Sequence, residues 1–411
     1  MSEKPESLPM RVLLPLFGVV AIDAIGMGIV LPLLPFYSQH FGATPLVLGA
    51  LVAVFSLGQF VTAPVLGKLS DRFGRKSVLL VSQAGTLLSF LMLASAGSLG
   101  MLFVARLLAG AATGNISVAS AFAADHSTPQ TRRRAIGLIA AGMGVGMMIG
   151  PSLSAALAPV SITTPIWAAV LLASGSLVVN LVFLKDDRKN IASSDVRAGR
   201  SLWQAVRSPG TLSVLAVLTL FYFAFAMWVS QFALFLQARY VWNGSPFGPR
   251  EVGFIFAASG AINIFVQAVA MKRFERVFPE SLLVVVSLSM FAVGMGLITL
   301  APGMQALAVG LVLASLGTAL SRPTLMAALS LTSSPHQQGA LMGASASLMA
   351  VCNVVAPLLA GALIDGGRYL VWSATIATIM GAGACMTLVS LRSHRWPSSH
   401  AAASNLAERV S

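Results

Sequence analysis

Hydrophobic residues run along this chain in long, nearly unbroken stretches, separated by short polar segments. A stretch of about 20 apolar residues is long enough to cross the roughly 30 Å hydrocarbon core of a bilayer as a helix. Twelve stretches meet this requirement, and they cover approximately residues 12–36, 46–66, 77–97, 101–123, 135–158, 164–184, 209–236, 251–271, 281–301, 303–327, 338–363 and 369–391. The pattern predicts an all-α integral membrane protein with twelve transmembrane helices.

A polar, charged segment divides the twelve stretches into two sets of six. The predicted organisation is an N-terminal six-helix bundle (1–184), a cytoplasmic linker (185–208), a C-terminal six-helix bundle (209–391) and a cytoplasmic tail (392–411). Parallel repeats of six spans occur in transporters whose halves rock against each other around a substrate site. The two bundles are therefore expected to be pseudo-symmetric.

The net charge of +13 raises the question of whether the chain binds nucleic acid. Only 9% of the residues are charged, and Lys and Arg concentrate before the first stretch and after the second, fourth, sixth, eighth and twelfth. The connections after the first, third, fifth and ninth contain none. Because basic residues mark cytoplasmic loops, this pattern predicts a multi-pass protein of the cell inner (plasma) membrane with both termini cytoplasmic. No nucleic-acid partner is needed to explain the basicity.

Asp23 is the only acid near the middle of a hydrophobic stretch. A carboxyl group at that depth is costly unless it is neutralised, paired or hydrated, so an intramembrane acid is a functional-site hypothesis by default. Asp23 is therefore the first candidate for a proton carrier. The alternative is an acid that faces a structural partner inside the helix bundle.

The segment GKLSDRFGRK, between the second and third stretches, resembles the loop signature of the major facilitator superfamily. An acid near a helix end can pair with nearby arginines and lock one of two rigid-body arrangements. A gating role is therefore expected for this loop. The alternative is that its basic residues only anchor the cytoplasmic face. The residues that carry the signature are Gly67, Asp71, Arg72, Gly74, Arg75 and Lys76.

Further segments resemble the twelve-span drug:proton antiporters, especially the tetracycline-efflux-like branch. The resemblance covers nearly the whole chain, and it implies that Asp23 and Arg106 act together in proton coupling. An arginine that only binds backbone carbonyls remains the alternative for Arg106. The matching positions are Asp23, Gly26, Gly28, Pro32 and Pro35 in the first stretch, Arg106, Gly110 and Gly114 in the fourth, and Pro323, Gly339, Gly343, Ser347 and Pro357 in the tenth and eleventh.

The fifth stretch contains GMGVGMMIGP, which includes Gly142, Gly146, Gly150 and Pro151. Small residues about four apart let a neighbouring backbone approach closely, and proline can bend the helix. The segment resembles the antiporter motif, which favours export. It departs from that motif at 154–155, where Ser and Ala replace the usual two glycines. Simple helix packing is the alternative.

Polar and aromatic residues inside the stretches are candidates for a substrate cavity, although each is equally able to bridge helices. They are Gln59, Asn115, Tyr222, Trp228, Gln231, Asn263, Gln267 and Asn353. The tetracycline exporters that this chain resembles carry additional acids in their third and ninth spans. This chain has no acid in either of those stretches. A neutral, amphipathic or anionic substrate is therefore favoured over a cationic metal–tetracycline complex. A drug, a siderophore or another metabolite fits.

No stretch contains histidine or a pair of acids, so the sequence favours neither an enzyme nor a metal site, and no cofactor is expected. A non-transporting sensor is also disfavoured, because the termini are short. The prediction is a secondary active transporter that exports a small amphipathic molecule in exchange for protons by alternating access. It is expected to work as a monomer whose partners are its small-molecule substrate, protons and the lipid bilayer. A proton-coupled importer of the same fold remains the alternative.

Overall fold

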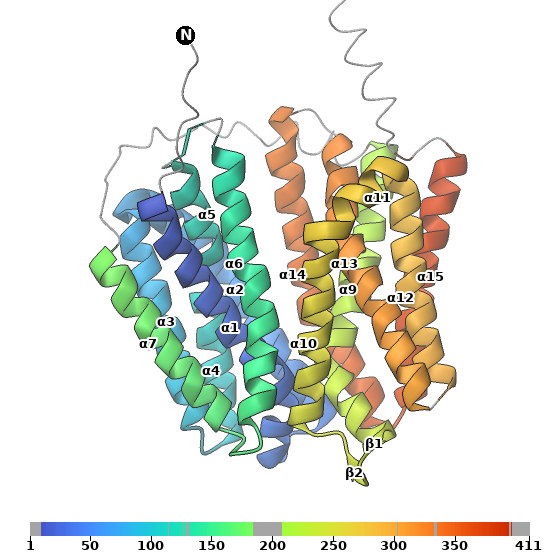
Figure 1. The fold of residues 1–411 in the computed structure, drawn as a ribbon, viewed down its shortest axis with the longest axis horizontal. Coiled ribbons are helices and arrows are strands. Elements are labelled where there is room, and N and C mark those ends of the chain that lie inside the picture. Colours follow the sequence, from blue (N-terminus) through green and yellow to red (C-terminus); the bar gives the residue numbers. More distant parts are fainter. Residues whose placement is uncertain are drawn as a thin grey trace, which may run out of the picture. The chain divides into compact units, whose positions relative to one another are not determined.

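The computed structural model describes residues 10–113, 115–125, 127–128, 131–183, 208–301, 303–332, 335–393 and 396, and they form mostly long helices (Figure 1). In the first half of the chain these are α1 (Met10–His40), α2 (Pro45–Phe73), α3 (Arg75–Ala94), α4 (Leu99–Ala112), α5 (Asn115–Asp125), α6 (Arg132–Leu157) and α7 (Thr164–Phe183). In the second half they are α9 (Pro209–Arg239), α10 (Pro249–Phe265), the π-helix η1 (Val266–Ala270), α11 (Met271–Val277), α12 (Glu280–Leu300), α13 (Met304–Leu331), α14 (Pro335–Asp365) and α15 (Tyr369–Arg392).

Within the described residues, eleven helices are long and apolar enough to cross a membrane. The twelfth predicted span, 101–123, is divided into α4 and α5. Thr113 ends α4, because its N–H bonds to the carbonyl of Gly110 rather than continuing the α-helical pattern, and its hydroxyl donates to the carbonyl of Ala109 at 2.6 Å. Such local side-chain bonds compete with the helix. The predicted fourth span thus consists of two helical segments, and the all-α membrane architecture is confirmed.

A short hairpin follows α9, and the hydrophobic pattern does not predict it. Strands β1 (Val241–Trp242) and β2 (Ser245–Pro246) pair antiparallel. Asn243 and Gly244 connect them with φ angles of +49° and +82°. An Asn-Gly pair favours these two left-handed conformations, which a tight two-residue hairpin requires.

The described contacts divide the chain into two compact units. The first comprises Met1–Ser193 with Leu236–Gly260, and the second comprises Ser194–Phe235 with Ala261–Ser411. In the first unit α1 packs along α6, and α3 packs against α4 and α7. In the second unit α12 packs against α13 and α15. The predicted division into two six-helix bundles joined by a linker stays a prediction, and residues 184–207 of that linker lie outside the described part.

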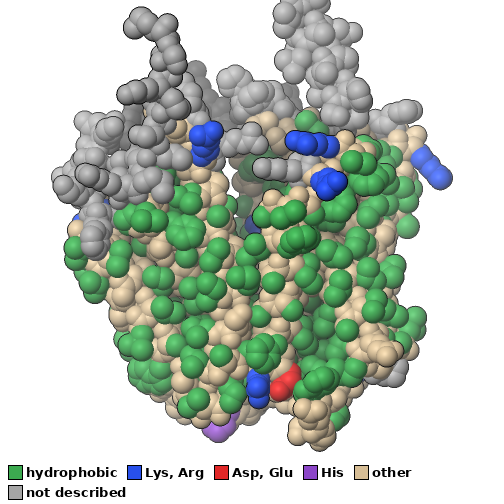
Figure 2. Space-filling model, in the orientation of Figure 1, with side chains coloured by type: hydrophobic (Ala, Val, Ile, Leu, Met, Phe, Trp, Pro, Cys, Tyr) green, Lys and Arg blue, Asp and Glu red, His purple; other side chains and the backbone are tan. Residues whose placement is uncertain are grey.

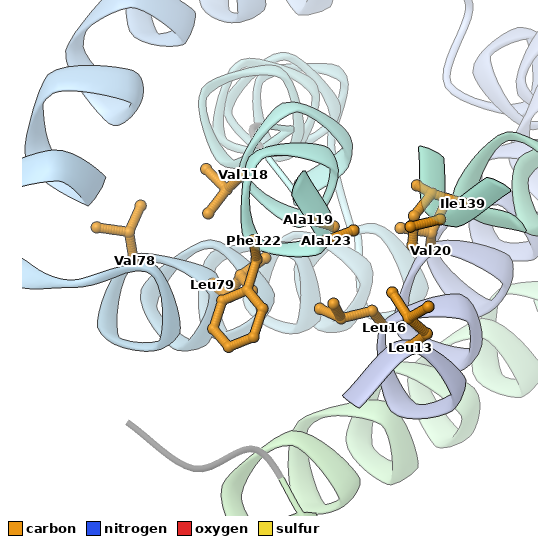
Figure 3. Close-up of a cluster of buried hydrophobic side chains, with 11 residues drawn as sticks. Leu13, Leu16, Val20, Val78, Leu79, Val118, Ala119, Phe122, Ala123 and Ile139 are labelled. Atoms are coloured by element: carbon orange, nitrogen blue, oxygen red, sulfur yellow. The ribbon is translucent and has the colours of Figure 1, made fainter. Parts of the chain in front are cut away.

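A cluster of buried apolar side chains holds α5 in the first unit (Figure 3). Phe122 of α5 points toward Leu79 of α3 and toward Leu16 of α1 in this view, and Ile139 of α6 closes another side. These contacts pack α5, the second half of the divided span, against α1, α3 and α6. The cluster consists of Leu13, Leu16, Val20, Val78, Leu79, Val118, Ala119, Phe122, Ala123, Ala135 and Ile139.

Large apolar side chains are exposed along the helices of each unit, as in Leu171 (74% exposed) and Leu300 (85% exposed). Figure 2 shows hydrophobic side chains spread over the visible helices. Water would penalise so much exposed apolar surface, whereas hydrocarbon accommodates it. The structure is therefore that of a multi-pass membrane protein.

Gly146 and Gly150 of α6 allow the backbone of α1 to approach closely. A Cβ atom at Gly146 would lie 2.5 Å from the carbonyl oxygen of Ala21 and 2.5 Å from Cβ of Ala24. At Gly150 it would lie 2.5 Å from the carbonyl oxygen of Ile25. The sequence prediction of a small-residue face on this helix is confirmed, and the helix that approaches it is α1.

Gly146→Ala is predicted to destabilise the protein by about 1–3 kcal/mol, because overpacking forces backbones apart. Gly137→Ala, on the same helix, is the matched control, because nothing lies within 4 Å of its added Cβ. The measurement is the midpoint of thermal unfolding in detergent. Equal midpoints for the two variants would contradict the close α1–α6 contact.

Candidate functional site

Asp23 and Arg106 line the same small cavity inside the first unit. The cavity has a volume of about 40 Å³, which is room for a few water molecules. Helices α1, α2, α3, α4 and α6 all contribute to its wall. The lining residues are Asp23, Ala24, Met27, Val30, Phe55, Thr86, Ser89, Phe90, Arg106, Ala109, Thr113 and Met143.

Arg106 is held against an aromatic ring. Its Cζ atom lies 4.2 Å from the centroid of the Phe55 ring, which is a cation–π arrangement. Gly110, one turn further along α4, makes this possible, because a Cβ there would overlap the Phe55 backbone. The Nε atom of Arg106 is buried and has no hydrogen-bond partner among the described residues. The guanidinium is thus positioned by α2 and keeps an unused donor.

The orientation of Asp23 follows from the contact between α1 and α6. Asp23 stands near the middle of α1. Its neighbours Ala21 and Ala24 pack on Gly146, so the helix is held in one rotation about its axis. With the helix in this rotation, Asp23 lines the cavity together with its neighbour Ala24. The prediction that Asp23 and Arg106 can communicate agrees with this placement, and their role in proton coupling stays a prediction.

Hydroxyl groups make up the remaining polar lining of the cavity. The Ser89 hydroxyl donates to the carbonyl of Thr86 at 2.7 Å, and Thr113 donates to Ala109 as described above. Each oxygen keeps lone pairs that can accept a hydrogen bond from water. The sequence does not single out these hydroxyls or Phe55. The only signal is the spacing of Thr86 and Ser89, which lie three residues apart in the apolar second half of α3.

The signature at the junction of α2 and α3 forms an ion pair. Arg75 Nη2 lies 2.8 Å from Asp71 Oδ1, with the Asp71 side chain 60% exposed and the Arg75 side chain 17% exposed. Arg75 Nη1 also donates to Ser70 Oγ at 2.6 Å. Lys76 Nζ reaches the carbonyl oxygen of Leu181 on α7 at 3.3 Å. The expected pairing of Asp71 with an arginine is present, and the gating role stays a prediction.

Most of this signature is helical rather than a loop. Residues from Gly67 to Phe73 belong to α2, and α3 begins at Arg75. Gly74 alone forms the break, with φ +92°, a conformation that favours glycine. Arg72 lies over the ring of its neighbour Phe73, at 5.4 Å from the centroid. The prediction of a loop is therefore wrong for the first part of the signature, because the helix continues up to its glycine.

Three of the predicted substrate residues are buried in the second unit. Tyr222 is 3% exposed, and its hydroxyl lies 3.1 Å from Ser345 Oγ on α14. Trp228 packs edge-on against Phe291 of α12, with ring centroids 5.7 Å apart. Gln231 has no exposed surface. In this conformation Tyr222 and Trp228 bridge helices, and a direct role toward substrate stays a prediction for all three.

The other predicted substrate residues are scattered. The side-chain amide of Gln267, in η1, donates to Asn263 one turn earlier. Gln59 on α2 and Asn353 on α14 are half-buried. The side chain of Asn115 lies outside the described part of the chain. Apart from the bond between Gln267 and Asn263, no described contact joins these residues.

Glu251, an acid near the start of α10, serves the local backbone. Its Oε2 atom accepts a hydrogen bond from the N–H of Gly248 at 2.9 Å. This bond satisfies a donor at the beginning of the helix. Glu251 therefore has a structural partner at the helix end, whereas Asp23 lies in the interior of its span.

The sequence model described as Major Facilitator Superfamily matches residues 16–304 and 247–407. The chain is 30% identical over 397 residues to "Tetracycline resistance protein, class C" of Escherichia coli, covering 93% of this chain and 97% of that protein. It is 25% identical to "Multidrug resistance protein 1" of Bacillus subtilis (strain 168), covering 88% and 92% respectively.

Solved structures share the fold. The crystal structure of the human organic anion transporter MFSD10 (TETRAN) has a TM-score of 0.69 and 23% identity, covering 93% of this chain and 100% of that one. The peptide transporter POT in complex with sulfate has a TM-score of 0.76 and 13% identity, covering 94% and 96%. With its apolar helices, its signature at the junction of α2 and α3 and relatives that match over nearly their full length, this chain is a membrane transporter rather than an enzyme and belongs to the major facilitator superfamily, in the tetracycline-efflux-like branch of drug:proton antiporters.

Proposed function

We propose that this protein is a secondary active transporter that exports a small amphipathic molecule in exchange for protons by alternating access. The observation that carries this proposal is the cavity shared by Asp23 and Arg106. A nearby cation favours the ionised carboxylate, whereas desolvation favours the neutral acid. Opposing effects of this kind make proton occupancy sensitive to small movements of the two side chains.

Because α4 ends at Thr113, movements of these two side chains can change the angle between α4 and α5. Thr113 lines the cavity together with Arg106, and α5 begins two residues later. A continuous helix would transmit a shift at Arg106 rigidly, whereas a broken one can change its angle there. We infer that proton loading at Asp23 alters how α4 meets α5.

Export is favoured over import by the relatives, which are named for tetracycline resistance and multidrug resistance. The glycines of α6 add support, because they resemble the antiporter motif. A proton-coupled importer with the same fold is the competing function. Its supporting observation is the replacement of two usual glycines by Ser154 and Ala155, both fully buried.

The Asp71–Arg75 pair is proposed to bias the conformational equilibrium. An exposed pair contributes only roughly 0–1 kcal/mol, so it can form in one state and break in another at little cost. The second hydrogen bond from Arg75 to Ser70 keeps the guanidinium in place when Asp71 leaves.

The proposed location is the inner (plasma) membrane, with both termini in the cytoplasm. The proposal rests on basic residues at the predicted cytoplasmic ends, which follow the positive-inside rule.

Single cysteines at Gln39, Gly97 or Ser161, all exposed at helix connections or ends, are predicted to react with a membrane-impermeant maleimide added to intact cells. A cysteine at Ser193 is predicted to react only after the membrane is opened. Cys352 and Cys385 are first replaced by serine, so that each reaction reports one position. The reverse labelling pattern would overturn the proposed orientation.

Asp71→Asn is predicted to slow turnover on the order of tenfold or more with a smaller change in KM, because a pair that biases the conformational equilibrium is lost. Initial transport rates are measured in proteoliposomes at matched protein content. Asp365→Asn, an exposed acid at the end of α14, is the control. If Asp71→Asn turns over at the wild-type rate, the signature only anchors the cytoplasmic face and has no gating role.

Asp23→Asn is predicted to abolish transport driven by an imposed pH gradient, because an amide cannot carry the coupled proton. Binding of substrate to the purified protein should persist. The assay follows export of a fluorescent amphipathic dye and the opposite movement of protons in the same proteoliposomes. Asp365→Asn should retain both. Gradient-driven export by Asp23→Asn with an unchanged pH profile would place the proton site elsewhere.

A further inference from the structure

Arg322 stands within a membrane span of the second unit. It lies about nine residues before the end of α13, which is roughly 14 Å at 1.5 Å per residue. The whole helix of 28 residues is about 42 Å long, so Arg322 falls about 7 Å from its middle. This position is inside a hydrocarbon core of about 30 Å. An arginine at such a depth must face a polar interior or a water-filled space.

Arg322 is the exposed position in an otherwise covered part of α13. From Leu313 to Leu331 every side chain except Arg322 is buried or half-buried. The adjacent Ser321 donates to Ser287 of α12 at 3.0 Å, and Leu320 packs in a cluster with Val266 of η1. Neighbouring helices therefore cover this half of α13. A lipid-facing helix surface would instead show a stripe of exposed apolar residues, which α13 lacks here.

A pair of hydroxyl groups is linked to the exposed guanidinium through Tyr222. Tyr222 of α9 is close enough to Arg322 for an electrostatic interaction. The hydroxyl of Tyr222 shares a hydrogen bond with Ser345 of α14. Arg322, Tyr222 and Ser345 thus come from three helices of one unit. Arg322 carries a permanent positive charge, and the hydroxyls of Tyr222 and Ser345 can each donate or accept a hydrogen bond.

No carboxylate neutralises this charge within the described part of the chain. The salt bridge found there joins Asp71 and Arg75, in the first unit. No hydrogen bond from the Arg322 guanidinium to a side chain or carbonyl is found there either. Arg106 differs, because an aromatic ring covers its guanidinium. A structural clamp would use the donors of Arg322 within the protein, whereas here they remain available to a ligand.

We propose that Arg322, with the hydroxyls of Tyr222 and Ser345, binds an anionic group of the transported molecule, such as a carboxylate or sulfonate. A guanidinium binds the two oxygens of such a group with parallel hydrogen bonds. This inference rests on the proposed transport function and narrows its substrate class from neutral or anionic amphipathic molecules to anionic ones. The apolar part of the ligand would lie against the surrounding helices.

The test uses carboxyfluorescein as the anionic probe and ethidium as the cationic one. Binding to the purified protein is measured by fluorescence anisotropy, and transport is measured in proteoliposomes with an imposed pH gradient. Arg322→Gln is expected to weaken carboxyfluorescein binding on the order of 10- to 100-fold, as when a charged hydrogen-bond partner is lost. Tyr222→Phe is expected to weaken it by roughly 2- to 10-fold.

Two further variants serve as controls. Arg322→Lys keeps the charge without the planar fork, so it should bind the anion better than Arg322→Gln and confirm that the site folds. Arg250→Gln, at the exposed start of α10, removes an arginine without touching the site and should bind as wild type does. Ethidium binding should not fall in any of these variants.

The outcomes separate the two proposals. Equal carboxyfluorescein binding by wild type and Arg322→Gln, or no binding by wild type, would overturn the anion site. Another outcome is that carboxyfluorescein binds in an Arg322-dependent way while neither dye is transported along the gradient. That result would support the anion site and contradict the proposed transport of these compounds. Transport of ethidium alone, with no anion binding, would support proton-driven export and overturn the anionic substrate class.

Discussion

The low dielectric of the hydrocarbon core is the constraint on which the structure depends. Charged groups are costly there, and the charged residues at membrane depth each have particular surroundings. Asp23 and Arg106 share a small cavity, and the exposed Arg322 interacts electrostatically with Tyr222, which bonds to Ser345. Apolar side chains could fill these positions at lower cost, and for this reason the proposed proton site and the proposed anion site are assigned to these charges.

Close helix packing makes these surroundings possible. Lipid tails are as apolar as leucine, so membrane helices associate through tight contacts between small residues. Gly146 and Gly150 let α1 reach α6, which fixes the rotation of Asp23. Gly110 lets α2 reach α4, which places the Phe55 ring over Arg106. The glycines thus act on the site indirectly, by deciding which side chains can meet.

Interactions at the helix ends differ in strength from those inside. The Asp71–Arg75 pair is largely exposed on the acid side, where water screens it and its net contribution is small. Weak pairs suit a protein that must exchange two states of similar free energy. The buried contacts between α1 and α6 involve backbone against backbone, and such packing does not deform continuously. Rigid helices with adjustable ends are what rocking motion requires.

The sequence by itself determined the spans, the family and the candidates Asp23, Arg106 and Asp71, because apolar runs, lone charges and signatures are local features. The Asn243–Gly244 hairpin is also local, although the long apolar runs obscure it. Only the tertiary structure decided that Phe55, Thr86, Ser89 and Thr113 line the cavity, and that Tyr222 bonds to Ser345. These contacts depend on how each helix is rotated about its axis and on which neighbour it meets. A nearly uniform apolar run does not fix that rotation, because every face of it is equally soluble in lipid.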